Sequence, residues 1–117
     1  ASDDGLFLVA LDGAEVVGMA WGTQARSDGG AGAPIAGRFH LSLVFIHPER
    51  WGEGIGRLLT DEVVAEAVRR GFKSVELWTH EDNWRAQRLY RSRGFAPTDG
   101  VERDGEGLPM RRWERAI

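Results

Sequence analysis

The chain has 117 residues, of which 42% are hydrophobic and 28% charged, and it carries a formal net charge of −3. These values are ordinary for one small globular domain, and they exclude a wholly disordered chain and a nucleic-acid binder that works by bulk positive charge. The absence of cysteine excludes disulfides, thiolate metal ligands and a cysteine nucleophile. We therefore expect a single domain over residues 1–117, cytoplasmic, with no membrane segment and no nucleic-acid partner.

The first part of the chain predicts a hairpin, a loop and a strand. Residues 6–11 and 15–21 are rich in Val, Leu, Phe and Trp, and they flank Asp12-Gly13, a dipeptide suited to a tight turn. Residues 22–38 contain five glycines and predict a flexible loop. Residues 39–47 predict a strand that Pro48 stops. Regular alternation would place on one face of this strand His40, Ser42, Val44 and Ile46.

The rest of the chain predicts two helices and three strands. Apolar residues recur at helical spacing over residues 54–70, and Gly71 stands where a capping glycine belongs. Residues 74–80 alternate as a strand, and Asp82 or Asn83 begins a helix that runs to about residue 93. Residues 96–117 read as two strands around a turn. The fold class is therefore α/β or α+β, with a mixed, mostly antiparallel sheet and a central parallel strand–helix–strand crossover.

Residues 51–57, Trp-Gly-Glu-Gly-Ile-Gly-Arg, join a strand to the start of a helix. Alternate glycines let the backbone approach a ligand closely, and the helix start attracts anions, so this loop suits a pyrophosphate. A nucleoside-triphosphate loop requires Gly-Lys-Ser/Thr, which is missing here. A Rossmann dinucleotide site requires a third glycine three residues after the second, but residues 57 and 59 are arginine and leucine. The third interpretation is coenzyme A.

Two segments carry a resemblance to a known family. Residues 46–56, Ile-His-Pro-Glu-Arg-Trp-Gly-Glu-Gly-Ile-Gly, resemble the acyl-coenzyme A motif of the GNAT superfamily of N-acetyltransferases. Residues 83–95, Asn-Trp-Arg-Ala-Gln-Arg-Leu-Tyr-Arg-Ser-Arg-Gly-Phe, are similar to that superfamily's asparagine–alanine–tyrosine–glycine–phenylalanine block. Two features depart from the family pattern. Trp51 stands where arginine or glutamine is common, and the strand and two helices that usually precede the hairpin are not in the sequence. Those helices often wall the acceptor site in the family, so either the chain is truncated at its N-terminus or another chain supplies the wall.

The resemblance implies transfer of an acetyl group from acetyl-coenzyme A to the primary amine of a small molecule or peptide, by direct attack. It implies Tyr90 as the acid that protonates the departing thiolate, since a phenol stays protonated at neutral pH. His40 is the candidate base, because imidazole exchanges protons near neutral pH, and Glu76 and His80 are reserves. The residues expected to contact the cosubstrate are Val44, Phe45, Ile46, Trp51, Gly52, Glu53, Gly54, Ile55, Gly56, Arg57, Asn83 and Tyr90.

Several alternatives stay open at this point. The chain could be a non-catalytic acyl-coenzyme A-binding or regulatory module, which turnover with an amine would exclude. The arginines clustered in residues 85–93 and 111–115 form either a solvated surface or the surroundings of a phosphate-bearing ligand. We expect no metal site, because the three histidines lack the spacing of a local ligand cluster. Dimerisation through the C-terminal strands is a further expectation.

Overall fold

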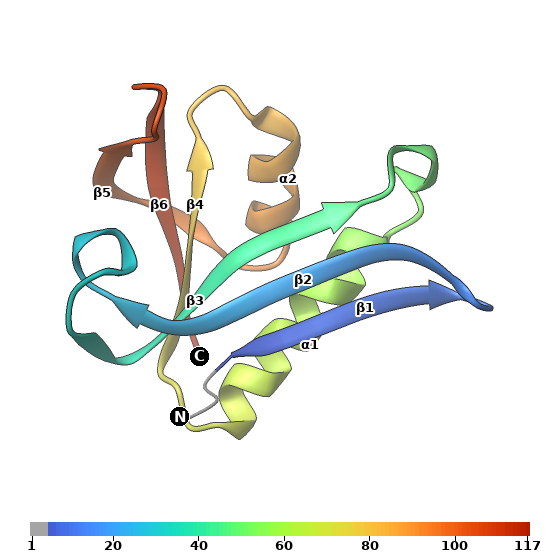
Figure 1. The fold of residues 1–117 in the computed structure, drawn as a ribbon, viewed down its shortest axis with the longest axis horizontal. Coiled ribbons are helices and arrows are strands. Elements are labelled where there is room, and N and C mark those ends of the chain that lie inside the picture. The colour runs from blue at the N-terminus through green and yellow to red at the C-terminus, as the bar shows by residue number, and fades with distance from the viewer. Residues whose placement is uncertain (1–4) are drawn as a thin grey trace.

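The computed structural model describes residues 5–117, whose six strands form one sheet in the order β1-β2-β3-β4-β6-β5 (Figure 1). The elements are β1 (Leu6–Asp12), β2 (Glu15–Arg26), η1 (Asp28–Gly30), β3 (Pro34–Ile46), η2 (Pro48–Arg50), α1 (Ile55–Arg69), β4 (Ser74–His80), α2 (Trp84–Ser92), β5 (Ala96–Arg103) and β6 (Pro109–Ala116). Strands β3 and β4 run parallel and are joined through α1, whereas the other neighbouring strands are antiparallel. The predicted fold class, with its central parallel crossover, is confirmed.

The loop predicted over residues 22–38 is mostly strand, so that prediction is wrong. β2 continues to Arg26, which pairs with Pro34 of β3, and the connection shrinks to residues 27–33. Glycine at position 22 is a packing requirement here, because a Cβ atom on Gly22 would lie 2.5 Å from the Phe39 ring. Local glycine content indicated a flexible segment, but cross-strand pairing gave these residues extended structure.

Both α-helices end as their sequences predict. Gly71 follows α1 with a φ of +86°, and Gly94 follows α2 with a φ of +89°. The amide of Phe72 donates to the Ala67 carbonyl at 3.0 Å, and Phe95 makes the equivalent bond at the end of α2. Each glycine therefore turns the chain so that the phenylalanine after it folds back onto the helix.

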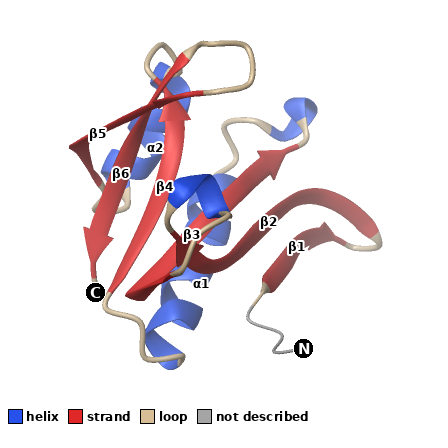
Figure 2. Ribbon diagram, turned by 60° about the vertical axis from the view of Figure 1, so that its left-hand side comes forward, coloured by secondary structure: helices blue, strands red, loops and turns tan. Residues whose placement is uncertain are grey.

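The two α-helices pack on one face of the sheet, as Figures 1 and 2 show. The core between them and the strands is formed by Val17, Ala20, Phe39, Leu41, Ile55, Leu59, Val63, Val64, Ala67, Val75, Leu77, Tyr90, Phe95 and Trp113. The other face exposes apolar side chains from β1, β2 and β3, among them Phe7, Trp21 and Leu43 in one cross-strand row. Neither helix of the described residues is long and apolar enough to cross a membrane.

A bulge interrupts β3 at Ser42. Leu41 pairs with Gly22 and Leu43 pairs with Trp21, so Ser42 is an extra residue on its strand. A bulge of this kind bends the strand and reverses which side chains face the core beyond it. The regular alternation predicted for residues 39–47 is therefore wrong.

The bulge decides which face of the sheet carries the candidate base. Leu41 is buried beneath the helices, whereas Leu43, two residues further on, is 46% exposed. Beyond the bulge, Val44 and Ile46 pack against the core instead. His40, whose neighbour Leu41 faces the helices, thus lies on the sheet face away from them, and it does not share a face with Val44 and Ile46 as predicted.

The sheet divides between its two parallel strands. β3 and β4 pair only from Arg38 to His40 and from Ser74 to Glu76. Beyond the His40–Glu76 pair, β3 stays with β2 and β4 stays with β6, and the two strands diverge (Figure 1). This division places the ends of β3 and β4 on either side of an opening next to the N-termini of both helices.

Candidate active site

A groove of about 660 Å³ lies between the end of β3, the start of α1 and the start of α2. It is lined by Val44, Phe45, Ile46, Arg50, Trp51, Gly52, Gly54, Ile55, Gly56, Arg57, Asp82, Asn83, Trp84, Arg85, Ala86, Leu89 and Tyr90. Every residue predicted to contact the cosubstrate is in this set except Glu53, whose carboxylate pairs with Arg50 at 2.9 Å. The two sequence motifs therefore lie on opposite walls of one groove.

The start of α1 presents backbone amides to the groove. Gly54 caps the helix with a φ of +85°, and its carbonyl accepts the first helical hydrogen bond, from Leu58 at 3.2 Å. The amides of residues 55–57 consequently have no acceptor within the helix, and they lie at its positive end. Gly56 has another role, because a Cβ atom there would lie 3.2 Å from Leu89 of α2. This arrangement fits a pyrophosphate ligand.

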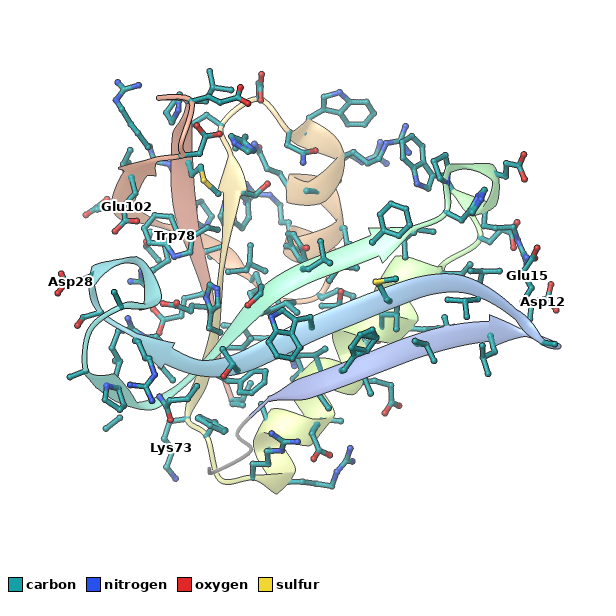
Figure 3. The ribbon with its side chains drawn as sticks, in the orientation of Figure 1. Asp12, Glu15, Asp28, Lys73, Trp78 and Glu102 are labelled. Carbon is teal, nitrogen blue, oxygen red and sulfur yellow. The ribbon has the colours of Figure 1, made fainter. Side chains whose placement is uncertain are left out.

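Arg50 ties the glycine loop to the tip of the β1–β2 hairpin. Its guanidinium forms ion pairs with Asp12 at 3.0 Å, Glu15 at 3.3 Å and Glu53 at 2.9 Å. Figure 3 shows Asp12 and Glu15 at that tip. Hydrogen bonding to Glu53 and to Asp12 raises the pKa of Arg50, and the same contact with Arg50 lowers the pKa of Glu53. Through these ion pairs Arg50 holds the glycine loop against the hairpin tip.

Tyr90 is the titratable residue buried at the floor of the groove. Its side chain is 8% exposed, and its ring meets the edge of Phe95 at a centroid distance of 5.9 Å. Burial raises the pKa of Tyr90 to about 12. Within residues 5–117 its hydroxyl makes no hydrogen bond, although Tyr90 lines the groove. The phenol is therefore protonated at neutral pH and available to donate to a ligand there.

Asn83 holds the start of α2. Its side-chain oxygen accepts a hydrogen bond from the Ala86 amide at 3.2 Å, which confirms the predicted helix cap. The side chain also lines the groove. Its amide nitrogen remains a candidate donor to a ligand, which stays a prediction.

A second cavity of about 450 Å³ lies on the sheet face away from the helices. Its walls come from β2, the 27–30 segment and the first half of β3, together with β4, β5 and β6. It contains His40 and Glu76, the last paired residues before β3 and β4 diverge. Trp78 and Glu102 line it as well, and Figure 3 shows them at the same end of the molecule. The two cavities therefore flank the opening in the sheet from opposite faces.

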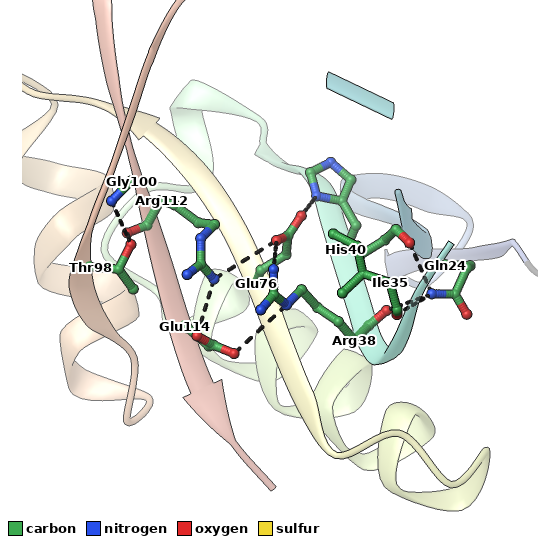
Figure 4. Close-up of polar contacts among 10 residues, drawn as sticks. Gln24, Ile35, Arg38, His40, Glu76, Thr98, Gly100, Arg112 and Glu114 are labelled. Carbon is green, nitrogen blue, oxygen red and sulfur yellow. Dashed lines mark hydrogen bonds and ion pairs between the residues drawn. The ribbon is translucent and has the colours of Figure 1, made fainter. Parts of the chain in front are cut away.

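Glu76 is the centre of a charge network in this cavity (Figure 4). Glu76 is only 4% exposed. Its carboxylate lies 2.9 Å from Nδ1 of His40, 3.5 Å from the guanidinium of Arg38 and 3.9 Å from that of Arg112. Glu114 completes the network with contacts of 3.1 Å to Arg112 and 3.8 Å to Arg38. Burial is the largest single influence on Glu114 and opposes its ionisation, yet hydrogen bonds from Arg112 and Ser74, together with the charges of the two arginines, lower the pKa of that carboxyl overall. Two arginines and two carboxylates thus balance in charge.

The network orients His40. An ionised carboxylate can only accept, so in the neutral form of the ring the hydrogen that bonds Glu76 is on Nδ1 of His40 and the lone pair is on Nε2. The structure does not bring His40 and Tyr90 into one cavity, because the β3 bulge places the imidazole on the other side of the sheet. Sequence reasoning named Glu76 as a reserve base but missed its partners Arg38 and Arg112, since their proximity depends on the strand register and no local motif reports it.

The other reserve base, His80, lines neither cavity. Its Nε2 lies 2.7 Å from a carboxylate oxygen of Asp104 in the turn between β5 and β6. Hydrogen bonding from His80, followed by the amides of Leu108 and Glu106, lowers the pKa of Asp104. His80 thus connects the end of β4 to that turn through its contact with Asp104. Across residues 5–117 no group of three acidic or histidine side chains could hold a metal ion.

A mixed sheet divided beside a glycine-rich helix start, with a buried phenol at the groove floor, is the arrangement that the resemblance to N-acetyltransferases implied. The profile of the acetyltransferase (GNAT) family matches residues 1–95. The chain belongs to this family, which confirms the resemblance seen in the sequence. Acetyl-coenzyme A is the cosubstrate of the family, and the backbone amides at the start of α1 suit its pyrophosphate.

Known proteins support this assignment. The chain is 36% identical to the mycothiol acetyltransferase of Geodermatophilus obscurus over 89 residues, 76% of this chain and 28% of that protein. It is 34% identical to that of Nocardiopsis dassonvillei over 99 residues, 82% of this chain and 29% of that protein. The chain thus spans little more than a quarter of the length of these relatives.

Solved structures share the fold. The ribosomal-protein-S18-alanine N-acetyltransferase of Escherichia coli superposes with a TM-score of 0.79 at 18% identity, over 100% of this chain and 72% of that one. The PaiA N-acetyltransferase of Thermoplasma acidophilum, solved in complex with coenzyme A, superposes with a TM-score of 0.74 at 24% identity, over 97% of this chain and 62% of that one.

Proposed function

We propose that this domain transfers an acetyl group from acetyl-coenzyme A to a primary amine, with the donor in the groove and the amine in the second cavity. The observation that carries the proposal is Tyr90, a buried phenol whose hydroxyl has no hydrogen-bond partner among residues 5–117 and that lines the groove beside the glycine loop. A tyrosine placed for packing alone would not need an open hydroxyl in a ligand-sized groove. The family assignment and the amide-rich start of α1 support the same donor.

The chain offers two kinds of backbone contact to the donor, which supplies an acetyl thioester when it is bound. The free amides at the start of α1 would bind the pyrophosphate. Residues 44–46 pair with β2 but not with β4, so backbone groups on the open side of β3 are left for the pantetheine arm. We propose that an amide from this stretch also stabilises the oxyanion as the amine adds to the carbonyl carbon.

Two side chains would move the protons. The amine nitrogen first forms a bond to the acetyl carbon, and the carbon–sulfur bond then breaks. We propose that His40 Nε2 takes the proton lost by the amine, directly or through water, while Glu76 holds the ring. Tyr90 would give its hydroxyl proton to the departing sulfur. Release of the proton from His40 to solvent and uptake of a proton by Tyr90 then restore both residues.

The acceptor is a primary amine of a small molecule or a peptide. The second cavity is lined by Trp78 and by charged groups, which suits a polar amine. Because the curated relatives are mycothiol acetyltransferases, amines related to mycothiol belong in the first panel of substrates. The structural relatives add peptide N-termini to that panel.

Calorimetry and a thiol-release assay test this function together. Acetyl-coenzyme A should bind the folded protein, whereas NADH and ATP should bind at least about tenfold more weakly because they lack the pantetheine arm. Coenzyme A should then be released in the presence of one amine class of the panel. Absence of binding would overturn the proposal. Binding without turnover by any amine would favour the non-catalytic module instead.

A further inference from the structure

Two exposed tryptophans hold an arginine at the rim of the groove. Trp51 is 51% exposed and Trp84 is 59% exposed, so neither belongs to the core. The guanidinium carbon of Arg85 lies 4.5 Å from the ring centroid of Trp51 and 5.4 Å from that of Trp84. All three residues line the groove. Such large exposed rings require an explanation that core packing does not provide.

The Trp51 ring is fixed by a hydrogen bond. Its indole nitrogen donates to the Ile46 carbonyl at 3.0 Å, which attaches the ring to the end of β3. Trp84 is the first residue of α2, and Arg88 lies over its ring at 5.9 Å. Trp51 and Trp84 therefore approach Arg85 from the two different walls of the groove. A ligand at this rim would contact both walls at once.

The N–H donors of Arg85 are the part of its side chain that a ligand could use. A guanidinium over an aromatic ring is held through its face, whereas its N–H donors point outward in its plane. Arg85 forms no ion pair with any residue from 5 to 117, in contrast to Arg50, which three carboxylates neutralise in the same groove. Arg85 is thus a cation that lies beside two indoles and has no ion-pair partner in the described part of the chain, and the ligand it suits is a phosphate.

We propose that Trp51, Arg85 and Trp84 form the site for the nucleotide end of the donor, with Arg85 binding the ribose 3′-phosphate and the indoles offering a stacking surface to the purine. This assignment rests on the proposed function. The glycine loop recognises the pyrophosphate, which coenzyme A shares with dephospho-coenzyme A, so Arg85 would discriminate between them.

Calorimetric titrations with coenzyme A, dephospho-coenzyme A and phosphopantetheine test the assignment at low ionic strength. The wild-type protein should bind coenzyme A about tenfold more tightly than dephospho-coenzyme A, and phosphopantetheine more weakly still. Arg85→Gln should reduce affinity for coenzyme A to the dephospho-coenzyme A value and leave the latter unchanged. Arg85→Lys should retain part of the difference, because it keeps the charge but not the planar donors.

Arg91→Gln is the matched control. Arg91 lies on the same helix and also stacks on an indole, 5.1 Å from the Trp113 ring centroid, but it does not line the groove. Its replacement should leave all three affinities unchanged. Equal binding of coenzyme A and dephospho-coenzyme A by the wild type, or equal loss of both in Arg85→Gln, would overturn the assignment while the proposed function stands. Binding of neither ligand would overturn both.

Discussion

The two cavities of this domain are built in different ways. The groove is formed by two continuous segments, 44–57 and 82–90, and much of its chemistry comes from backbone amides and from one phenol. The second cavity draws on five strands and the 27–30 segment, and its chemistry comes from side chains that meet only because of the strand register. A substitution in the groove should therefore affect only the residues next to it, whereas a substitution in the second cavity should also alter the contacts of the other residues in the charge network.

The largest effect is expected for Tyr90→Phe, which removes one oxygen from the groove. Loss of a general acid should reduce kcat by about 10²- to 10⁴-fold. Affinity for acetyl-coenzyme A should stay within about twofold, because the ring and its contact with Phe95 remain. A thiol-release assay measures kcat, and calorimetry measures the affinity for acetyl-coenzyme A. A parallel loss of affinity would contradict the acid role and indicate a structural one.

The His40–Glu76 pair should show coupling in a double-mutant cycle. His40→Gln should reduce kcat by about 10²-fold, and Glu76→Gln by about tenfold, because the imidazole loses the carboxylate that orients it. The double variant should be no slower than His40→Gln alone, since a positioning residue has no effect once the residue it positions is absent. Affinity for acetyl-coenzyme A should be unchanged in all three. Additive losses would show that Glu76 acts independently of His40.

The role of the glycine loop in binding acetyl-coenzyme A can be tested by comparing Gly54 with Gly71, a glycine of the same backbone conformation outside the groove. Gly54 and Gly71 have φ values of +85° and +86° at the two ends of α1. Alanine at either position should reduce the free energy of unfolding by about 1–2 kcal/mol, because an L-residue is strained there. Only Gly54→Ala should also weaken acetyl-coenzyme A binding, by about tenfold, since it displaces the amides of the groove. Equal affinities of the two variants would exclude the amides as the anion site.

The sequence predicted the groove much better than the second cavity, for a physical reason. The glycine loop, the caps at Gly71 and Asn83, and the strand over residues 74–80 depend on interactions within a few residues, which a local motif encodes. The bulge at Ser42 depends on how β3 pairs with β2, so regular alternation placed His40 on the wrong face. Long-range pairing likewise turned the glycine-rich 22–38 segment into strands.

The smallest effect is expected outside both cavities, at Asp104. Its pKa is lowered in the folded protein, first by His80 and then by two amides of its own turn, so its ionised form stabilises the fold above the ordinary pKa of a carboxyl group. That stabilisation is lost as the pH falls through the lowered pKa of the folded state. Asp104→Asn should accordingly reduce Tm at neutral pH by less than Gly54→Ala does, and the difference from wild type should shrink on acidification below about pH 4. Thermal unfolding across this range measures it. Because His80 lines neither cavity, thiol release by Asp104→Asn should equal that of the wild type at neutral pH, and a loss of turnover would show that this turn is coupled to the active site.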